Sequence, residues 1–245
     1  MNQQLLLDNI RDVLIRLEET ILFAVIERAQ FKQNPVIYER GAFPDISESE
    51  SLVGYLLHET ERIHARMRRY TSPGEYPYFD DLPDPVLPEL RYDENPLYKH
   101  TVNLNAKIRV MYETGVVPAV CSKGDDRQYG SCAVCDVACL QAFSKRIHYG
   151  MFVAESKYRQ SPGRFDALID VGDKESIGRE ITDSDVESMV LDRVGRKADK
   201  YLQDINACSS QKTVAPETIV EIYRGGIIPL TKQVEIEYLL RRHQA

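Results

Sequence analysis

The chain has 245 residues, of which 43% are hydrophobic and 28% are charged, an ordinary composition for a globular protein. Its formal net charge is −7, which argues against general binding to nucleic acid or to anionic membranes. No apolar run approaches the ~18 residues that a membrane-spanning helix needs, and the N-terminus lacks the basic region of a signal peptide. Five cysteines in a chain without an export signal are typical of reduced thiols, so we expect a cytoplasmic protein.

The hydrophobic periodicity predicts helices along almost the whole chain, and no segment shows convincing β alternation. The first helix is expected over 5–33, where Asn34-Pro35 ends it, and the second over 48–70. The second helix would bury the apolar stripe made by Leu52, Leu56, Ile63, Met67 and Tyr70.

Further helices are predicted over 102–117, 131–160, 164–180, 184–206 and 216–242. Gly225-Gly226 and Pro229 should bend the last of them. The longest helices lie at the two ends and in the middle, so we expect them to pack on one another. The sequence therefore predicts an all-α fold with a single domain over residues 1–245.

Cationic residues stand on the apolar faces of two of these helices. Arg146 and Lys157 are eleven residues apart, about three helical turns, so both should project from the same face of helix 131–160. Arg11 lies between Leu7 and Leu14 on the first helix. One interpretation is a clamp for an anion; the other is ion pairing with a neighbouring helix, or snorkelling in the case of Arg11.

Glu235 stands one turn after Thr231 and between two aliphatic residues. Poor solvation would raise the pKa of its carboxyl group. The alternative is a surface carboxylate paired with Lys232.

Glu187 follows Ser184 by three positions, which is also the pattern of a capping box. Taken together, these residues predict a bundle interior with three cations and two carboxylates. Such an interior suits a small dianion that also carries hydroxyl or ether oxygens.

The stretch "GSCAVCDVACL" places Cys132, Cys135 and Cys139 on one face of a helix. Small buried side chains explain this spacing, since no fourth thiolate is placed by sequence to complete a metal site. Glu61-x-x-His64 has the spacing of a di-iron ligand pair, but such a site needs a second copy of the motif and the chain has none.

Around the charged residues described above, the chain resembles the eukaryotic, allosteric branch of the AroQ-type chorismate mutases, an all-helical family. Four segments carry the resemblance: "NIRDVLIRLEETILFAVIERAQF" (9–31), "RIHARMRRYTSPGEYPYF" (62–79), "YGSCAVCDVACLQAFSKRIHYGMFVAESK" (129–157) and "IIPLTKQVEIEYLLRR" (227–242). The resemblance implies rearrangement of chorismate to prephenate on the way to phenylalanine and tyrosine, without cofactor or metal. It implies catalytic helices at about 5–33, 131–160, 184–206 and 216–242, and an effector and dimer region at about 48–130.

The resemblance also implies roles for individual residues. Arg11 and Arg146 should bind the two substrate carboxylates, and Lys157 a carboxylate and the ether oxygen. Protonated Glu235 should share the ether oxygen, Thr231 should contact a carboxylate, and Glu187 should accept from the ring hydroxyl. Asp183 stands where the yeast-type pattern has Asn; its extra negative charge is tolerable if it caps a helix or acts through its backbone.

Yeast-type members are homodimers that tryptophan activates and tyrosine inhibits at a site between subunits. The matching positions here are Arg68 and Arg69 from one subunit, with Gln128, Gly130 and Ser131 from the other. Departures at Gln128, Val134 and Ala215 make tryptophan the favoured effector and leave the response to tyrosine open. A helical scaffold without catalysis remains the alternative from another class, although it gives no reason to keep the charged residues together.

Overall fold

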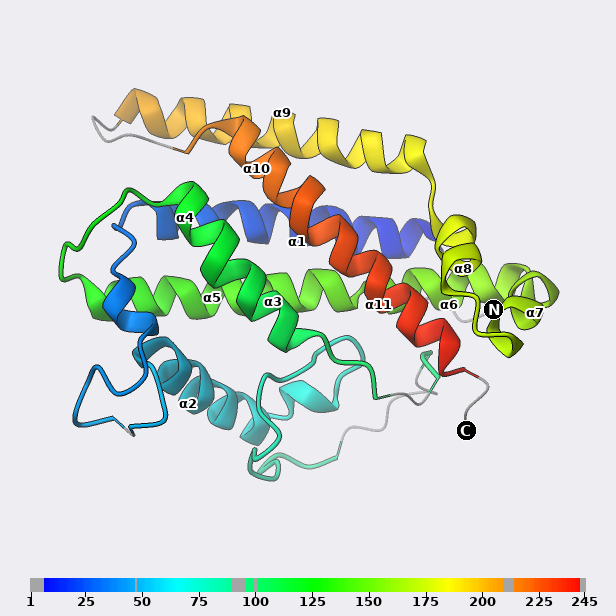
Figure 1. Ribbon diagram of the computed structural model, residues 1–245, viewed down its shortest axis with the longest axis horizontal. Helices are drawn as coiled ribbons and strands as arrows, with labels where there is room; N and C mark the ends of the chain where they lie inside the picture. Colours follow the sequence, from blue (N-terminus) through cyan, green and yellow to red (C-terminus); the bar gives the residue numbers. More distant parts are fainter. Residues whose placement is uncertain (1–6, 47, 90–95, 99–100, 209–213, 243–245) are drawn as a thin grey trace.

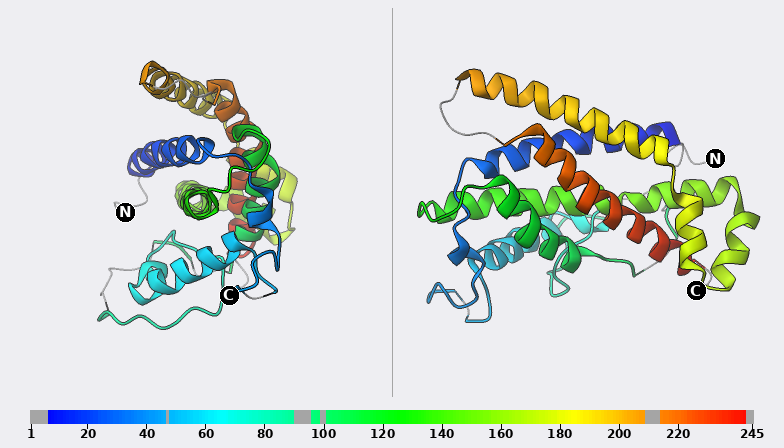
Figure 2. Two further views of the ribbon diagram at one scale, coloured as in Figure 1. Left: turned by 90° about the vertical axis from the view of Figure 1, so that its left-hand side faces the viewer. Right: turned by 45° about the horizontal axis from the view of Figure 1, so that its top comes forward.

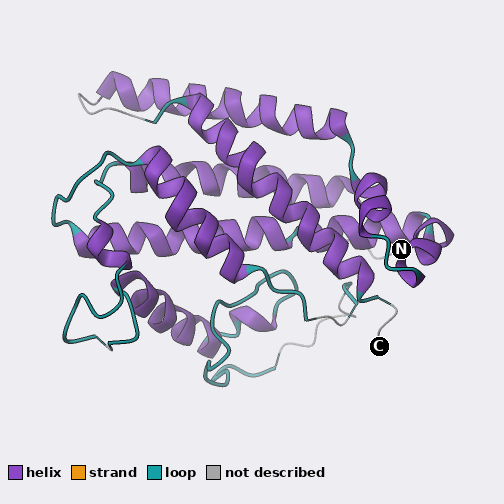
Figure 3. Cartoon of the chain, viewed as in Figure 1, coloured by secondary structure: helices purple, strands orange, loops and turns teal. Residues whose placement is uncertain are grey.

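The computed structural model describes residues 7–46, 48–89, 96–98, 101–208 and 214–242. All regular secondary structure in these ranges is helical, which confirms the all-α prediction (Figure 3). The α-helices are α1 (Leu7–Ala29), α2 (Leu52–Arg66), α3 (Asn105–Met111), α4 (Val117–Val120), α5 (Tyr129–His148), α6 (Gly150–Gln160), α7 (Pro162–Asp170), α8 (Lys174–Ile181), α9 (Ser184–Cys208), α10 (Pro216–Ile222) and α11 (Ile228–Leu240). Short 3₁₀ turns cover Pro35–Tyr38 and Arg69–Thr71. None of the described helices is long and apolar enough to cross a membrane.

The long helices form a layered bundle. α1 packs along α5, and the two run side by side through the centre of the molecule (Figure 1). α10 and α11 cross this layer obliquely, from α9 at one edge to α6 and α8 at the other (Figures 1 and 2). α2 also packs against α5 (Figure 1). Residues from the two ends and the middle of the chain therefore meet around α5 and α6.

Two of the long helical rods contain π-helical segments, η4 (Tyr112–Val116) and η5 (Tyr223–Ile227). The second contains Gly225 and Gly226, so the predicted irregularity of the last helix takes the form of a π segment that joins α10 to α11. A Cβ atom on Gly226 would lie 2.3 Å from the sulfur of Met111. The glycine therefore leaves room for the side chain of Met111 from α3, which would have to move aside for any larger residue.

Three helix predictions were wrong. The predicted helix 131–160 is divided at Tyr149 into α5 and α6. The segment 164–180 is not one helix, because Gly172 takes a positive φ of 69° and separates α7 from α8. The buried face of α2 is not the predicted stripe either: Val53, Leu57 and Ala65 are buried, while Ile63 and Met67 are 62% and 50% exposed. α2 has two apolar faces, and periodicity alone does not say which of them meets the core. The predicted start of the first helix at residue 5 lies outside the described residues.

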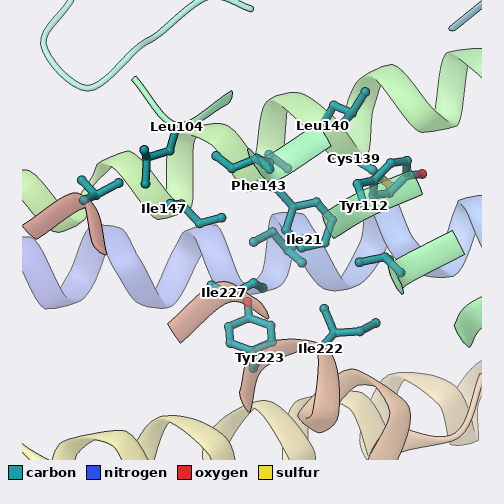
Figure 4. Close-up of a cluster of buried hydrophobic side chains, with 14 of the residues drawn as sticks. Ile21, Leu104, Tyr112, Cys139, Leu140, Phe143, Ile147, Ile222, Tyr223 and Ile227 are labelled. Atoms are coloured by element: carbon teal, nitrogen blue, oxygen red, sulfur yellow. The ribbon is translucent and has the colours of Figure 1, made fainter. Parts of the chain in front are cut away.

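The core is continuous from α1 through α5 to the C-terminal helices. Figure 4 shows Cys139 beside Tyr112, and Phe143 and Ile21 between them and Tyr223 of the π segment. Cys132 and Cys139 are fully buried and Cys135 is partly buried, all three as free thiols. Burial raises the pKa of Cys132 to about 12, which keeps it protonated and inert at neutral pH. The interpretation of these cysteines as small core side chains fits this environment.

Candidate active site

A cavity of about 290 Å³ opens between α1, α5–α6, α9 and α11. All seven residues predicted from the sequence to be catalytic or substrate-binding line it, together with an apolar wall that includes Val153, Val186 and Ile228. Its ionisable lining consists of Arg11, Arg146, Lys157, Lys232, Asp183, Glu187 and Glu235. The predicted set of three cations and two carboxylates is therefore enlarged by Lys232 and Asp183.

Arg146 comes from the last turn of the core helix α5, where only 5% of it is exposed. Its Nε and Nη1 atoms are buried and have no hydrogen-bond partner among the described residues. A buried guanidinium without partners is unfavourable by several kcal/mol unless an anion meets it. Arg146 thus marks the point at which the cavity is built to receive a negative group.

Lys157 enters the cavity from α6, on the same face as Arg146, as the spacing predicted. Its ammonium group donates to the main-chain oxygen of Ile181 at the end of α8. That contact holds the side chain across the cavity mouth, with Ile181 itself part of the lining. An ammonium group offers three donors, so this contact leaves two for a ligand.

Glu235 is 7% exposed, and burial raises the pKa of its carboxyl group to about 7. Lys157, Arg146 and Lys232 oppose this rise by favouring the charged form, while Glu187 adds to it. The expected poor solvation is confirmed, and the alternative of a surface ion pair with Lys232 is wrong. Near neutral pH this carboxyl group exchanges between a hydrogen-bond donor and an acceptor.

Gly150 allows α11 to approach the α5–α6 rod closely. A Cβ atom there would lie 2.8 Å from Cγ2 of Thr231 and 3.2 Å from Cγ of Glu235. Thr231 itself donates from Oγ1 to the main-chain oxygen of Ile227 at 2.7 Å. The glycine therefore sets how deeply Thr231 and Glu235 enter the cavity.

The contacts of Glu187 rule out a capping box with Ser184. Its Oε1 lies 2.6 Å from Nζ of Lys232, so the carboxylate is paired across two helices rather than with its own helix start. The cap is Asp183, whose Oδ1 accepts from the main-chain N–H groups of Asp185 and Val186, both at 3.1 Å. This capping role removes the objection to an aspartate at position 183.

Arg11 lies at the rim rather than inside. Its side chain is 57% exposed, and Nη1 lies 3.2 Å from Oδ1 of Asp8 on the same helix. The exposure makes the Asp8 contact a weak one, on the order of 0.5 kcal/mol. Arg11 is therefore free to turn toward an anion in the cavity at little energetic cost.

Two lining residues and one supporting glycine were not predicted to belong to the site. Lys232 was considered only as a partner of Glu235, and Gln160 not at all. Gly150, which lies behind Thr231 and Glu235, was considered only as a member of a helical stripe. A signal existed for Gly150, because a glycine inside a helix costs about 1 kcal/mol and usually has a packing reason. No comparable signal existed for Lys232, since its partner comes from another helix.

The two halves of the predicted effector site are not brought together within one chain. Arg69 donates to Oε1 of Gln141 at 2.9 Å and pairs with Glu75 at 3.0 Å, and Arg68 donates to the main-chain oxygen of Pro88. Gln128, Gly130 and Ser131 stand exposed at the start of α5. Gln141 is eleven residues further along that helix, about 16 Å at 1.5 Å per residue.

Among the described residues, no group of three or more His, Cys, Asp and Glu side chains is placed to hold a metal ion. Glu61 of the Glu-x-x-His pair is buried and accepts the main-chain N–H groups of Tyr78 and Phe79, at 2.8 and 3.3 Å. Its neighbour His64 lies with Nδ1 3.0 Å from Nη1 of Arg69. These contacts assign both residues to the packing of the loop over α2.

Comparison with known proteins gives relatives over the full length of the chain. The profile of the family described as chorismate mutase type II matches residues 128–236. The chorismate mutase of Schizosaccharomyces pombe is 42% identical, with 99% of this chain and 98% of the relative covered. The crystal structure of the Candida albicans enzyme in complex with L-Trp is 41% identical and superposes with a TM-score of 0.91, covering 98% of this chain and 92% of that one.

A third relative is the crystal structure of AtCM1 with tyrosine bound in its allosteric site. It is 41% identical, has a TM-score of 0.87, and covers 98% of each chain. Identity of this order along the whole length, together with the same helical fold, shows descent from a common enzyme. The chain belongs to the type II chorismate mutases.

Proposed function

We propose that the cavity binds chorismate as a compact chair and catalyses its rearrangement to prephenate. The observation that carries the proposal is the buried guanidinium of Arg146, which lacks partners and shares its cavity with Lys157 and Glu235. Chorismate supplies two carboxylates, an ether oxygen and a ring hydroxyl. The cavity offers cations for the carboxylates, hydrogen-bond donors for the ether oxygen and a carboxylate for the ring hydroxyl.

Each side chain then has a defined task. Arg146 holds one carboxylate at the bottom of the cavity, and Arg11 turns from the rim to close on the other. Lys157 bridges a carboxylate and the ether oxygen. Thr231 adds a contact to a carboxylate, and Glu187 accepts from the ring hydroxyl. Asp183 contributes by fixing the start of α9, from which Glu187 projects.

The rearrangement breaks the C–O ether bond as a new C–C bond forms, and no proton or electron leaves the substrate. Catalysis therefore consists of holding the reactive conformation and stabilising the negative charge that grows on the ether oxygen. Lys157 and protonated Glu235 are the donors at that oxygen. Because they are fixed by the helices before the reaction starts, they need no reorganisation as the charge develops.

A direct assay of chorismate disappearance tests the proposal. The purified protein should consume chorismate and form prephenate in equal amounts, and an Arg146→Met variant should be slower by at least about 10²-fold because one carboxylate loses its only buried cation. A wild-type protein that leaves chorismate unchanged, while its circular dichroism spectrum shows folded helices, would contradict the assignment. The alternative of a helical scaffold without catalysis would then be favoured.

We further propose that the chain is a homodimer regulated by aromatic amino acids at the Arg68–Arg69 and Gly130–Ser131 positions. Two features support it: these halves lie about 16 Å apart along α5 in one chain, and Ile63 and Met67 form an uncovered apolar patch on α2. The relatives bind L-Trp or tyrosine. Val134, 58% exposed where a hydroxyl would assist tyrosine, favours tryptophan.

Light scattering and activity titrations with tryptophan, tyrosine and phenylalanine test dimer and effector separately. A monomer at micromolar concentration would remove the shared site, whereas a dimer insensitive to all three amino acids would remove only the regulation. We place the enzyme in the cytoplasm and in phenylalanine and tyrosine synthesis. Its free thiols, three of them buried, support a reducing compartment.

A further inference from the structure

Lys232 stands next to Thr231 on α11 and lines the same cavity. Its Nζ atom lies 2.6 Å from Oε1 of Glu187, which projects from the first turns of α9. The two side chains are 32% and 30% exposed, so the pair sits in the cavity wall rather than on open surface. It is a direct charged link between α9 and α11 at the site.

We propose that Lys232 is a positioning residue of the reaction: it holds the carboxylate of Glu187 aimed at the ring hydroxyl of chorismate, and its charge sets the upper pH limit of activity. The inference rests on the proposed function, because it assigns a task to Glu187 within that mechanism. It adds an electrostatic role for a side chain that makes no contact with the reacting atoms.

Glu187 needs such a partner because it faces a dianion. An unpaired carboxylate in the cavity would repel the substrate. The ammonium group of Lys232 engages Oε1, which leaves Oε2 to accept from a hydroxyl group. Lys232 therefore makes it possible for a negative residue to serve in a site for a negative ligand.

The charge of the cavity lining leads to the same conclusion. Four cations (Arg11, Arg146, Lys157, Lys232) stand against Asp183 and Glu187, while Glu235 is neutral in its protonated form. The net charge is then 4 − 2 = +2, equal and opposite to that of chorismate. Without Lys232 the net charge falls to +1, which weakens the attraction for the substrate.

Lys232 also acts on Glu235. Charged groups face Glu235 from every side: Arg146 from α5, Lys157 from α6, Glu187 from α9 and Lys232 from its own helix, with Arg11 and Asp183 in the same cavity. Lys232 lowers the pKa of Glu235 against the effect of burial. Removal of this cation should raise that pKa, so that the donor form of Glu235 persists to higher pH.

The test uses Lys232→Gln and Lys232→Arg, with Lys200→Gln on the exposed face of α9 as a matched control. Lys232→Gln should raise KM for chorismate about tenfold while kcat at acidic pH stays within about twofold. Its alkaline limb of activity should move to higher pH. Lys232→Arg should keep the KM and the alkaline limb of the wild type, because it keeps the positive charge. Lys200→Gln should match the wild type in both.

Two outcomes would overturn the inference. An unchanged KM and pH limb in Lys232→Gln would show that the pair has no role. A limb that moves to lower pH would show that the substitution had merely loosened the wall and admitted water to Glu235. Thermal unfolding checks that the variants fold, and in a Glu187→Gln background Lys232→Gln should raise KM by a smaller factor than it does in the wild-type background. All these results presuppose a wild type that converts chorismate, so loss of the proposed function itself is seen separately.

Discussion

Two arginines are buried among the residues that the structure describes, and their surroundings differ completely. Arg28, at the end of α1, is 0% exposed, and every one of its nitrogen atoms is bonded. Nε lies 2.6 Å from Oδ1 of Asp136, and Nη1 and Nη2 donate to the main-chain oxygens of Lys32 and Gln33 that follow the helix. Arg146, on α5, is 5% exposed with two of its nitrogen atoms unbonded.

The carboxyl groups of the two regions differ in the same way. Asp136 accepts from Tyr112 at 2.6 Å and from Tyr38 at 2.9 Å besides Arg28, and these donors oppose the rise in pKa that its burial causes. Glu235 has no such donors, and burial raises its pKa to about 7. A buried charge with all its bonds made belongs to the framework. A buried charge with bonds missing marks the place where a ligand completes the structure.

Disrupting the fully bonded cluster around Arg28 and Asp136 should have the largest effect on stability. Asp136→Ala leaves Arg28 buried without its counter-ion, and removal of one partner of such a pair costs about 3–5 kcal/mol. We expect the free energy of unfolding in urea to fall by this amount. The exposed Asp199→Ala on α9 should change it by less than about 0.5 kcal/mol.

The folded fraction of Asp136→Ala should keep its KM for chorismate, because Asp136 lies outside the cavity lining. A loss of activity without loss of stability would show that the two regions are not separate in the way their contacts suggest.

Substitutions in the cavity should have the opposite effect, a loss of activity with little loss of stability. Lys157→Ala removes a preorganised donor at the ether oxygen, which typically costs on the order of 3–4 kcal/mol, or a ~10²–10³-fold loss in rate. Because Lys157 is only half-buried and donates to the main-chain oxygen of Ile181, stability should change little. Steady-state kinetics beside urea unfolding measures both. Turnover like that of the wild type would contradict the proposed role.

The difference between these regions was only partly visible in the sequence. The spacing of Arg146 and Lys157 fixed their common face correctly, because a helix turns by a constant angle per residue. Arg28, on α1, is also a cation on a buried helix face. The pattern could not tell that Arg28 is satisfied and Arg146 is not, since their partners or lack of partners depend on segments far away in the chain.

The wrong predictions share this cause. Ile63 and Met67 match the helical period of α2 as well as the residues that are buried, and only tertiary packing decides between the two faces. Lys232 stands one turn before Glu235 by sequence, but its ammonium group pairs with Glu187 on α9. Local patterns predict which side chains share a helix face, whereas the contacts between helices require the structure.

A smaller effect is expected at Gly150, where helix packing also determines the placement of cavity residues. An alanine there would bring Cβ within 2.8 Å of the branched side chain of Thr231, so α11 must shift away from the α5–α6 rod. We expect kcat to fall about tenfold or more, because small displacements of positioned groups are costly in rate. Stability should fall by no more than about 2 kcal/mol, since alanine also favours the helix by about 1 kcal/mol.

The control is Gly163→Ala on α7, where a Cβ atom would meet nothing within 4 Å. That variant should keep the rate of the wild type. Equal losses in the two glycine variants would mean that helix flexibility, rather than the approach of α11, controls the rate.

The mildest change is Glu235→Gln, which removes the titration but keeps a donor. Wild-type activity should be highest under acidic conditions and fall as pH rises through about 7, where Glu235 loses its proton. An amide cannot ionise, so the variant should have a flat profile and exceed the wild type above pH 7. A flat wild-type profile through the same range would exclude protonated Glu235 as the donor.

Stability gives an independent measurement of the same proton. The folded pKa of Glu235, about 7, lies above its ordinary value of 4.5, so the folded state binds more protons between these values and stability falls as pH rises through that window. Glu61 has the same raised pKa, about 7, and it remains in the variant. Glu235→Gln should therefore reduce the pH dependence of the unfolding free energy without abolishing it. An unchanged slope would mean that water reaches Glu235 in the folded protein and that the cavity is less closed than Arg146 and Glu235 together indicate.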